Sequence, residues 1–475
     1  MPAEVENVVL VTVDSLRADA VGGDDSVSPV LDGLADDGVV FENAMAHGNW
    51  TPFSFPSVHG SRPVFDEGAD IGVASTPTLA EQLSEAGVET GGFNAANGFL
   101  TDHWGYDRGF DEFEPFVESG GYSKYLAAHP TVQAWVQLGT SPFRRAAAAL
   151  RGESDARPFA DVSRMGDLEQ HATDFLEGAA DDGFFLWVHY MDTHTPYVPA
   201  PRHLREVSDT HFGLFRMLGA HLRTGLGWDV DQRTLGTLRT LYDGTVRQVD
   251  ASVGRLLDTL DAEGLAEETA VVVAGDHGEE FLDHGHLAHY PKLYGELVEV
   301  PYVVTHPDGG SDTVHQPVGL DTIAPTVCDL LGVDPAPAWE GESVAPALDG
   351  ETIESRSPVV SVAVRGESVT SQPIPRRLDD GELLVSARDA RWTYVEHTES
   401  GHRELYDRRE DPDEQRDLCA ETTEDTAPPP VLDRLSAAVA DHVDRLETAA
   451  DADESGDDGQ TSDEIAARLK ALGYK

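Results

Sequence analysis

The chain has 475 residues, with 33 basic and 87 acidic side chains and a formal net charge of −54. Its hydrophobic content of 40% is sufficient for a packed core, and its length exceeds what a single core usually serves. Such an acidic surface repels nucleic acid and anionic membranes, so neither is expected as a partner. No apolar run approaches the roughly 18 residues that a membrane helix requires.

The acidic residues are spread along the whole chain, and only four of the basic residues are lysines. A disordered acidic tail is the alternative explanation, but this spread favours a halophilic protein, because high ionic strength screens the self-repulsion. The first residues lead into a strand without a basic segment, so a cytoplasmic location is expected. The only cysteines, Cys328 and Cys419, provide neither a disulfide framework nor a zinc cluster.

Strand-like and helical patterns alternate over the first 350 residues. Helical spacing of apolar residues predicts helices at Thr78–Ala86 and Leu235–Leu260, and residues 123–180 are predicted to form a mostly helical insertion. Apolar runs predict buried strands at Val8–Val13, Val39–Asn43, Thr90–Asn94, Phe184–Tyr190, Ala270–Ala274 and Tyr302–Thr305. This alternation indicates an α/β fold with a mostly parallel sheet covered by helices on both faces, and we assign the catalytic domain to residues 1–350.

The pattern changes in residues 351–475. Short strand-like runs at Val359–Val364, Leu383–Ala387 and Arg391–Glu396 predict a small antiparallel sheet. A helix with one apolar face is expected after Pro428–Pro430, and Ser462 is expected to cap a last short helix. This part of the chain therefore forms a second, smaller unit.

Two of the predicted strands end in potential metal ligands. Asp276 and His277 follow the run at 271–275, and Asp14 and Ser15 follow the N-terminal strand. A lone Asp-His pair is usually a solvated strand end, but further histidines follow within about a dozen residues, which more often marks a site. They are His284, His286 and His289. Because carboxyl ends of parallel strands share one edge of a sheet, we expect one metal ion between the two strands, with Ser15 as a weaker ligand.

A second group of residues could carry the reaction. Ser54 lies in the segment 49–60, where a hydroxyl at a strand-to-helix turn could attack an anionic ester; Thr51 and Ser57 are rivals for this role. The alternative, a helix N-terminus with capping hydroxyls, is favoured by composition alone. His194 follows another strand and could donate to an oxyanion or a leaving group. Three acids after His277 are expected to be structural or exposed: Glu279, Glu280 and Asp283.

Taken in order, these segments resemble the sulfatase family of the alkaline phosphatase superfamily, in a haloarchaeal-type form. The resemblance covers the segment around Asp14, the Ser54-Phe-Pro-Ser57 motif and the block from Asp276 to Pro301. It implies an alkaline phosphatase-like α/β/α sandwich followed by a small C-terminal antiparallel-sheet domain. It also implies one divalent metal ion, with Ca²⁺ or Mn²⁺ expected. Asp14, Asp276, His277 and the Ser54 oxygen would bind it, while His194 and His289 would contact the sulfate or phosphate.

The resemblance implies a metal-dependent hydrolase of sulfate esters, with Ser54 or its formylglycine as nucleophile. Two departures keep other functions open: Val58 stands where the family's maturation signal has an arginine, and His289 stands where a lysine is common. The alternatives are a phosphodiesterase or phosphotransferase that uses unmodified Ser54, and a non-catalytic relative that binds anionic glycans. The expected partner is a small-molecule or glycan ester of sulfate or phosphate; the oligomeric state is not indicated.

Overall fold

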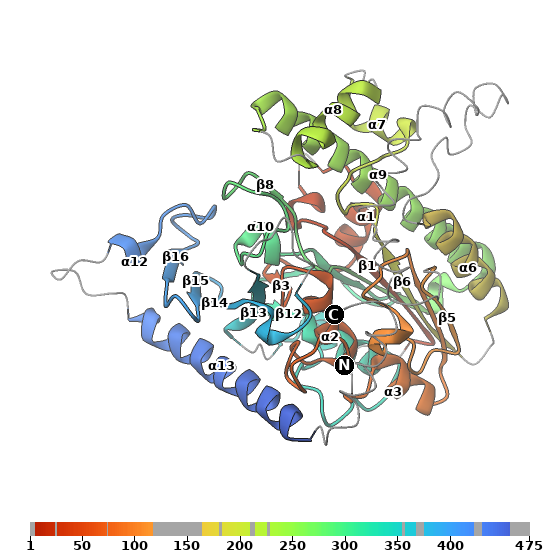
Figure 1. The fold of residues 1–475 in the computed structure, drawn as a ribbon. Coiled ribbons are helices and arrows are strands. Elements are labelled where there is room, and N and C mark those ends of the chain that lie inside the picture. The colour runs from red at the N-terminus through yellow and green to blue at the C-terminus, as the bar shows by residue number, and fades with distance from the viewer. Residues whose placement is uncertain are drawn as a thin grey trace, which may run out of the picture.

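The computed structural model describes residues 5–23, 26–73, 75–116, 164–179, 183–209, 214–225, 229–353, 357–366, 375–421 and 430–456. A large twisted sheet lies at the centre of the molecule, with helices on both faces, and a smaller sheet lies beside it with the long helix α13 (Figure 1). This arrangement confirms the predicted α/β class and the separate C-terminal sheet. In the described parts of the chain, no helix combines the length and apolarity needed to cross a membrane.

The central sheet has eight strands in the order β11-β2-β10-β7-β1-β6-β4-β5. All neighbouring pairs are parallel except those of β10, which runs antiparallel to both β7 and β2. Six strands match the predicted runs: β1 (Asn7–Val13), β2 (Val39–Phe41), β4 (Glu89–Asn94), β6 (Phe184–Tyr190), β7 (Thr269–Gly275) and β10 (Tyr302–Thr305). The short edge strands β5 (Glu112–Glu114) and β11 (Asp312–Val314) were not predicted.

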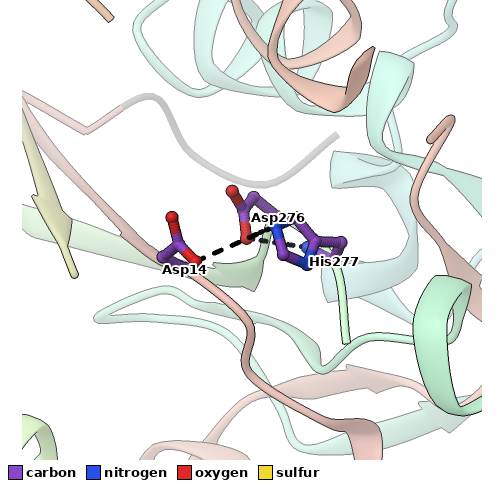
Figure 2. Close-up of side chains that lie close together, drawn as sticks. All are labelled: Asp14, Asp276 and His277. Carbon is purple, nitrogen blue, oxygen red and sulfur yellow. Dashed lines mark hydrogen bonds and ion pairs between the residues drawn. The ribbon is translucent and has the colours of Figure 1, made fainter. Parts of the chain in front are cut away.

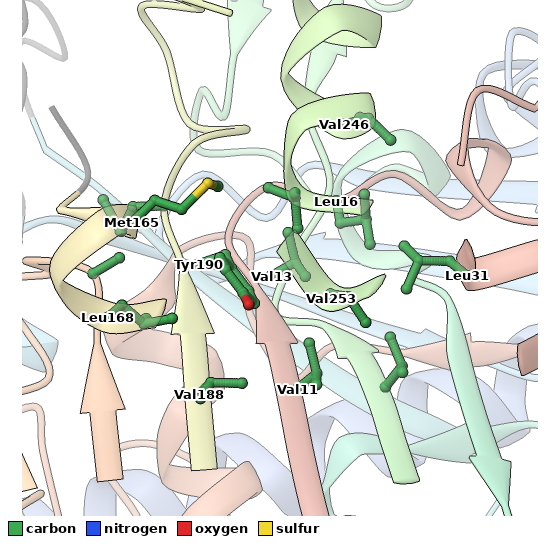
Figure 3. Packing of buried hydrophobic residues seen from close by; sticks show 14 of the residues in the cluster. Val11, Val13, Leu16, Leu31, Met165, Leu168, Val188, Tyr190, Val246 and Val253 are labelled. Carbon is green, nitrogen blue, oxygen red and sulfur yellow. The ribbon is translucent and has the colours of Figure 1, made fainter. Parts of the chain in front are cut away.

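Alternate residues of the central strands face two separate cores. Val11, Val13 and Val188 pack under one helical layer (Figure 3). That layer contains α1 (Pro29–Asp37), α6 (Met165–Gly178) and α9 (Gln232–Glu263), the last of which matches the helix predicted at Leu235–Leu260. The intervening residues, such as Leu10 and Trp187, pack under α2 (Thr51–Gly60), α3 (Leu79–Glu85) and α11 (Ile323–Leu330). Burial on both faces is why these strands read as continuous apolar runs.

Shorter elements surround the sheet. The helices α7 (Pro201–Val207) and α8 (Leu214–Gly225) pack against α9, and α10 (Gly295–Val298) follows the pair β8 (Glu280–Phe281) and β9 (Leu287–Ala288). A second two-stranded pair joins β3 (Ala44–Met45) to β12 (Val318–Gly319). Residues 123–163 of the predicted helical insertion lie outside the described residues, and α6 is its observed helix.

The C-terminal sheet is antiparallel, in the order β13 (Val359–Arg365), β14 (Glu382–Arg388), β15 (Trp392–His397) and β16 (Arg403–Asp407). The last strand, β16, was not predicted. Two helices accompany the sheet: α12 (Leu418–Glu421) and α13 (Val431–Gly456), which matches the helix expected after the prolines. The helix expected at Ser462 lies outside the described residues. The sheet contacts the large unit where the Val362 N–H donates to the His47 carbonyl at 2.8 Å.

Candidate active site

The ends of β1 and β7 place two aspartates side by side. The two strands are parallel and pair Val13 with Gly275, so the next residue of each strand emerges at the same edge of the sheet. One carboxylate oxygen each of Asp14 and Asp276 and one ring nitrogen of His277 lie within 4.8 Å of one another (Figure 2). All three side chains are buried. Within the described parts of the chain, this is the one group of three acidic, histidine or cysteine side chains close enough to share an ion.

Three donors hold the carboxylate of Asp14. The Ser15 hydroxyl donates to Oδ1 at 2.8 Å, while the Thr51 hydroxyl and the Asn97 amide donate to Oδ2 at 3.0 and 3.2 Å. Burial opposes ionisation, but neighbouring imidazoles outweigh it and hold the pKa of Asp14 below its usual value. Asp14 is therefore an oriented carboxylate, and the hydroxyl of Ser15 serves to orient it.

Asp276 and His277 are fixed by the backbone around them. Oδ1 of Asp276 accepts from the Ser15 N–H at 3.0 Å and from the His277 N–H at 2.8 Å, and burial raises the pKa of Asp276 to about 7. Nδ1 of His277 donates to the Gly278 carbonyl at 2.9 Å. This leaves Nε2 of His277 facing both carboxylates, 3.8 Å from an oxygen of each. An imidazole held in this way has its free nitrogen available to a metal.

The two other predicted histidines lie next to this cluster. The ring of His289 is 4.9 Å from that of His194 and 5.0 Å from that of His277, centroid to centroid. The His289 carbonyl accepts from the Trp50 indole N–H, which ties it to the start of α2. Burial lowers the pKa of His194 and lowers that of His289 to about 3. The structure thus brings together both histidines and the three candidate ligands.

Ser54 is the fourth residue of α2, and its side chain is fully buried. Its hydroxyl makes no hydrogen bond within the part of the chain that the structure describes. Among the hydroxyls of α2, the one that contacts the cluster is that of Thr51, at the first position of the helix. The motif serine makes no such hydrogen bond to Asp14.

Sequence reasoning missed two further residues of the site. Glu279, expected to be structural or exposed, is fully buried beside His289, with 3.6 Å between Oε2 and Nδ1. Burial raises the pKa of this acid to about 7. Asn97 lies in the loop after β4 and carried no signal, since an amide in a loop is usually part of a turn. The position of Glu279 directly after the metal motif was the only available hint.

A mostly parallel sheet with acids and histidines gathered at its carboxyl edge, joined to a small antiparallel sheet, is the architecture of an ester hydrolase of the alkaline phosphatase superfamily. The chain belongs to the sulfatase family, whose model, described as "Sulfatase", matches residues 6–333.

Two curated relatives illustrate this membership. The ulvan-active sulfatase of Formosa agariphila is 24% identical over 474 residues, which cover 93% of this chain and 82% of that protein. The Δ4,5-hexuronate-2-O-sulfatase of Bacteroides thetaiotaomicron is 29% identical over 182 residues. This second match spans 36% of this chain and 35% of the length of that relative.

Solved structures share the fold over nearly the whole chain. A putative sulfatase from Bacteroides thetaiotaomicron superposes with a TM-score of 0.69 and 18% identity, covering 94% of this chain and 93% of that one. The phosphonate monoester hydrolase of Agrobacterium radiobacter gives a TM-score of 0.65 and 18% identity, with 94% and 96% covered. At this identity the likeness establishes the fold.

Proposed function

We propose that this protein is a metal-dependent hydrolase of sulfate esters, with one divalent ion held by Asp14, Asp276 and His277. The observation that supports this most directly is the spacing of the three ligand atoms, all within 4.8 Å of one another. Two carboxylates and one imidazole suit a hard or borderline cation, and Ca²⁺ and Mn²⁺ are the candidates. When bound, such an ion supplies positive charge that polarises the ester and offsets the charge of the transition state.

The remaining residues of the site would handle the ester itself. His194 and His289 lie beside the cluster. They would contact the sulfate group of the ester and the oxygen of the departing alcohol. The attacking oxygen would come from α2, which carries the hydroxyls of Thr51 and Ser54. Since two relatives bear the names of an ulvan-active and a hexuronate sulfatase, a sulfated glycan is the substrate class we propose.

Phosphoryl transfer is the second candidate. Val58 is buried within α2, where the family's maturation signal has an arginine, so an unmodified hydroxyl is favoured over formylglycine. A phosphonate monoester hydrolase is among the proteins with this fold. Intact-mass and peptide analysis of the segment 49–60 tests this directly, because conversion of a serine to formylglycine removes two hydrogens.

The decisive experiment compares turnover of aryl sulfate, aryl phosphodiester and sulfated oligosaccharides by chelator-treated and Ca²⁺- or Mn²⁺-reloaded protein. Asp276→Asn should reduce the amount of bound metal and lower turnover by more than roughly 100-fold. That is the upper end of the loss when a residue that only hydrogen-bonds to a metal ligand is replaced, and Asp276 is proposed as a ligand itself. Asp36→Asn, which alters an exposed acid, is the matched control and should change neither. Full turnover of every active ester after complete chelation would refute the proposal, and glycan binding without turnover would favour the non-catalytic alternative.

A halophilic, cytoplasmic setting is also proposed. The support is the net charge of −54 together with the small number of lysines. Fractionation of the source cells with an antibody to the chain tests the location. Recovery outside the cytoplasmic fraction would refute it.

A further inference from the structure

We infer that Thr51, rather than the motif residue Ser54, supplies the attacking oxygen; this inference rests on the proposed hydrolase function. Thr51 is the first residue of α2, and its hydroxyl donates to Oδ2 of Asp14 at 3.0 Å. The Asn97 amide donates to the same hydroxyl at 3.3 Å. The hydroxyl therefore lies against the candidate metal ligands and is oriented by two neighbours.

The carboxylate that Thr51 contacts belongs to the candidate metal cluster, in which Asp14 lies beside Asp276 and His277. A hydroxyl held against Asp14 therefore occupies a place from which an oxygen could contact both an ion and a substrate.

Ser54 lies in different surroundings. Its hydroxyl is fully buried and makes no hydrogen bond among the described residues. The rings on either side of it pack into two separate cores: Phe53 against Phe65, and Phe55 against Trp187. No hydrogen bond of the described chain joins Ser54 to a candidate ligand, whereas Thr51 makes one to Asp14.

The start of α2 is also joined to the segment that carries His289. The preceding residue, Trp50, donates its indole N–H to the His289 carbonyl, and Asn49 donates to the Tyr290 carbonyl at 3.2 Å. These contacts tie the start of α2, whose Thr51 hydroxyl contacts Asp14, to the backbone of the segment that carries His289. An ester attacked by Thr51 could therefore present its departing oxygen to a histidine.

The reaction balances with this assignment. Oγ1 of Thr51 forms a bond to phosphorus or sulfur, and the bond from that atom to the alcohol oxygen breaks. The hydroxyl proton passes to Asp14, which already accepts that hydrogen bond, and the departing oxygen takes a proton from His194 or His289. Binding of an anionic ester favours the protonated ring. In the second step water returns a proton to that histidine, its oxygen replaces Oγ1, and Thr51 regains its proton from Asp14.

Threonine also restricts the chemistry. Its Cβ carries a methyl group, so oxidation would give a ketone instead of the formylglycine aldehyde. The covalent intermediate then has no second oxygen on Cβ, and water must attack phosphorus or sulfur directly. Thr51 would therefore act as an unmodified hydroxyl.

The test is to locate the covalent intermediate. Mn²⁺- or Ca²⁺-loaded full-length protein is mixed with an activated aryl phosphate or aryl sulfate, quenched in acid and digested for tandem mass spectrometry. Fragmentation around Pro52 separates residue 51 from residue 54. We expect one phosphoryl or sulfuryl group on Thr51 in the wild type and in Ser54→Ala, and on residue 51 in Thr51→Ser.

Thr51→Val should form no adduct and lose turnover by at least about 10⁴-fold. Ser57→Ala is the matched control, since it removes another hydroxyl of α2, one that donates to the Arg62 carbonyl. An adduct on Ser54, or turnover by Thr51→Val, would overturn the inference and leave the hydrolase function intact. If Thr51→Val does not fold, the adduct position in the wild type and in Thr51→Ser decides. If the wild-type protein forms no adduct and turns over none of the esters, the hydrolase function itself is refuted.

Discussion

His59 illustrates how burial makes the folding of the chain sensitive to pH through a single residue. Its ring lies in an aromatic environment, 4.3 Å from the ring of Trp187 and stacked on Phe55. Burial, and secondarily His189, lowers the pKa of His59 to about 3. The unfolded chain binds a proton near pH 6.5 and the folded one does not. The stability contributed by the neutral ring is therefore complete above pH 6.5 and is lost as pH falls toward 3, by about 1.4 kcal/mol per unit.

Replacing His59 by phenylalanine should remove this contribution to acid sensitivity. Phenylalanine suits the aromatic surroundings and cannot be protonated, so the free energy of unfolding should fall less steeply between pH 7 and pH 5. Urea unfolding of chelator-treated protein at several pH values measures the slope. His103→Phe, at an exposed position, is the control and should keep the wild-type slope. An unchanged slope in His59→Phe would contradict the argument.

The site was predictable where strands end and unpredictable where a helix begins. Asp14 and Asp276 follow buried apolar runs, which fix their edge of the sheet from sequence alone. The start of α2 has no such signal, because its capping residue is Trp50, whose side chain makes no capping hydrogen bond. Capping preferences would place Thr51 or Ser54 there instead. Tertiary contacts determine the residue at which α2 begins, and therefore which of its hydroxyls contacts Asp14.

At the scale of elements, the sequence predicted strands that are buried on both faces. The runs that became β1, β6 and β7 are mostly apolar and fully buried. The edge strands β5 and β11 have three residues each and are only partly buried, so they carry no comparable pattern. The direction of β10 was also out of reach, because a run buried on both faces looks the same whether it is parallel or antiparallel.

One buried ion pair connects the C-terminal sheet to the loop that follows the metal motif. Arg388, at the end of β14, is fully buried; it donates to both oxygens of Glu414 at 2.9 Å and to the Leu293 carbonyl at 2.6 Å. Glu414 also accepts from the Gly295 N–H at 2.9 Å. Arg388→Met should leave Glu414 charged and buried, which costs about 3–5 kcal/mol of unfolding free energy.

Two controls separate this effect from the loss of packing. Arg388→Met combined with Glu414→Gln should recover most of the loss, because the amide still accepts from Gly295 and neither charge remains. Arg416→Met breaks an exposed pair with Glu421 and should change stability far less than Arg388→Met does, because solvent screens that pair. Equal destabilisation by Arg388→Met and Arg416→Met in denaturant titrations would show that the buried pair has no special role.

For the whole molecule, charge is the dominant property, and the long helix α9 shows how it acts locally. No basic residue lies in the last turn of α9, where a cation would complement the helix dipole. Exposed acids occupy this end and the turn that follows: Asp261, Glu263, Glu267 and Glu268. At low salt these charges repel the carbonyl end of the helix and one another, so this region should depend strongly on ionic strength.

The net charge of −54 predicts that salt stabilises the folded chain through screening. The unfolding midpoint should rise steeply between 0.1 M and about 1 M KCl, where the screening length falls to about 3 Å, and more slowly above that. A variant with Asp261→Asn, Glu263→Gln, Glu267→Gln and Glu268→Gln should be more stable than wild type in dilute buffer, with the difference vanishing in 2 M KCl. Screening predicts this convergence, whereas a general salting-out of apolar surface would raise both proteins equally at every concentration. Parallel thermal melts of the two proteins across the KCl series distinguish these outcomes, and a constant difference between them would show that self-repulsion does not limit the stability of this fold.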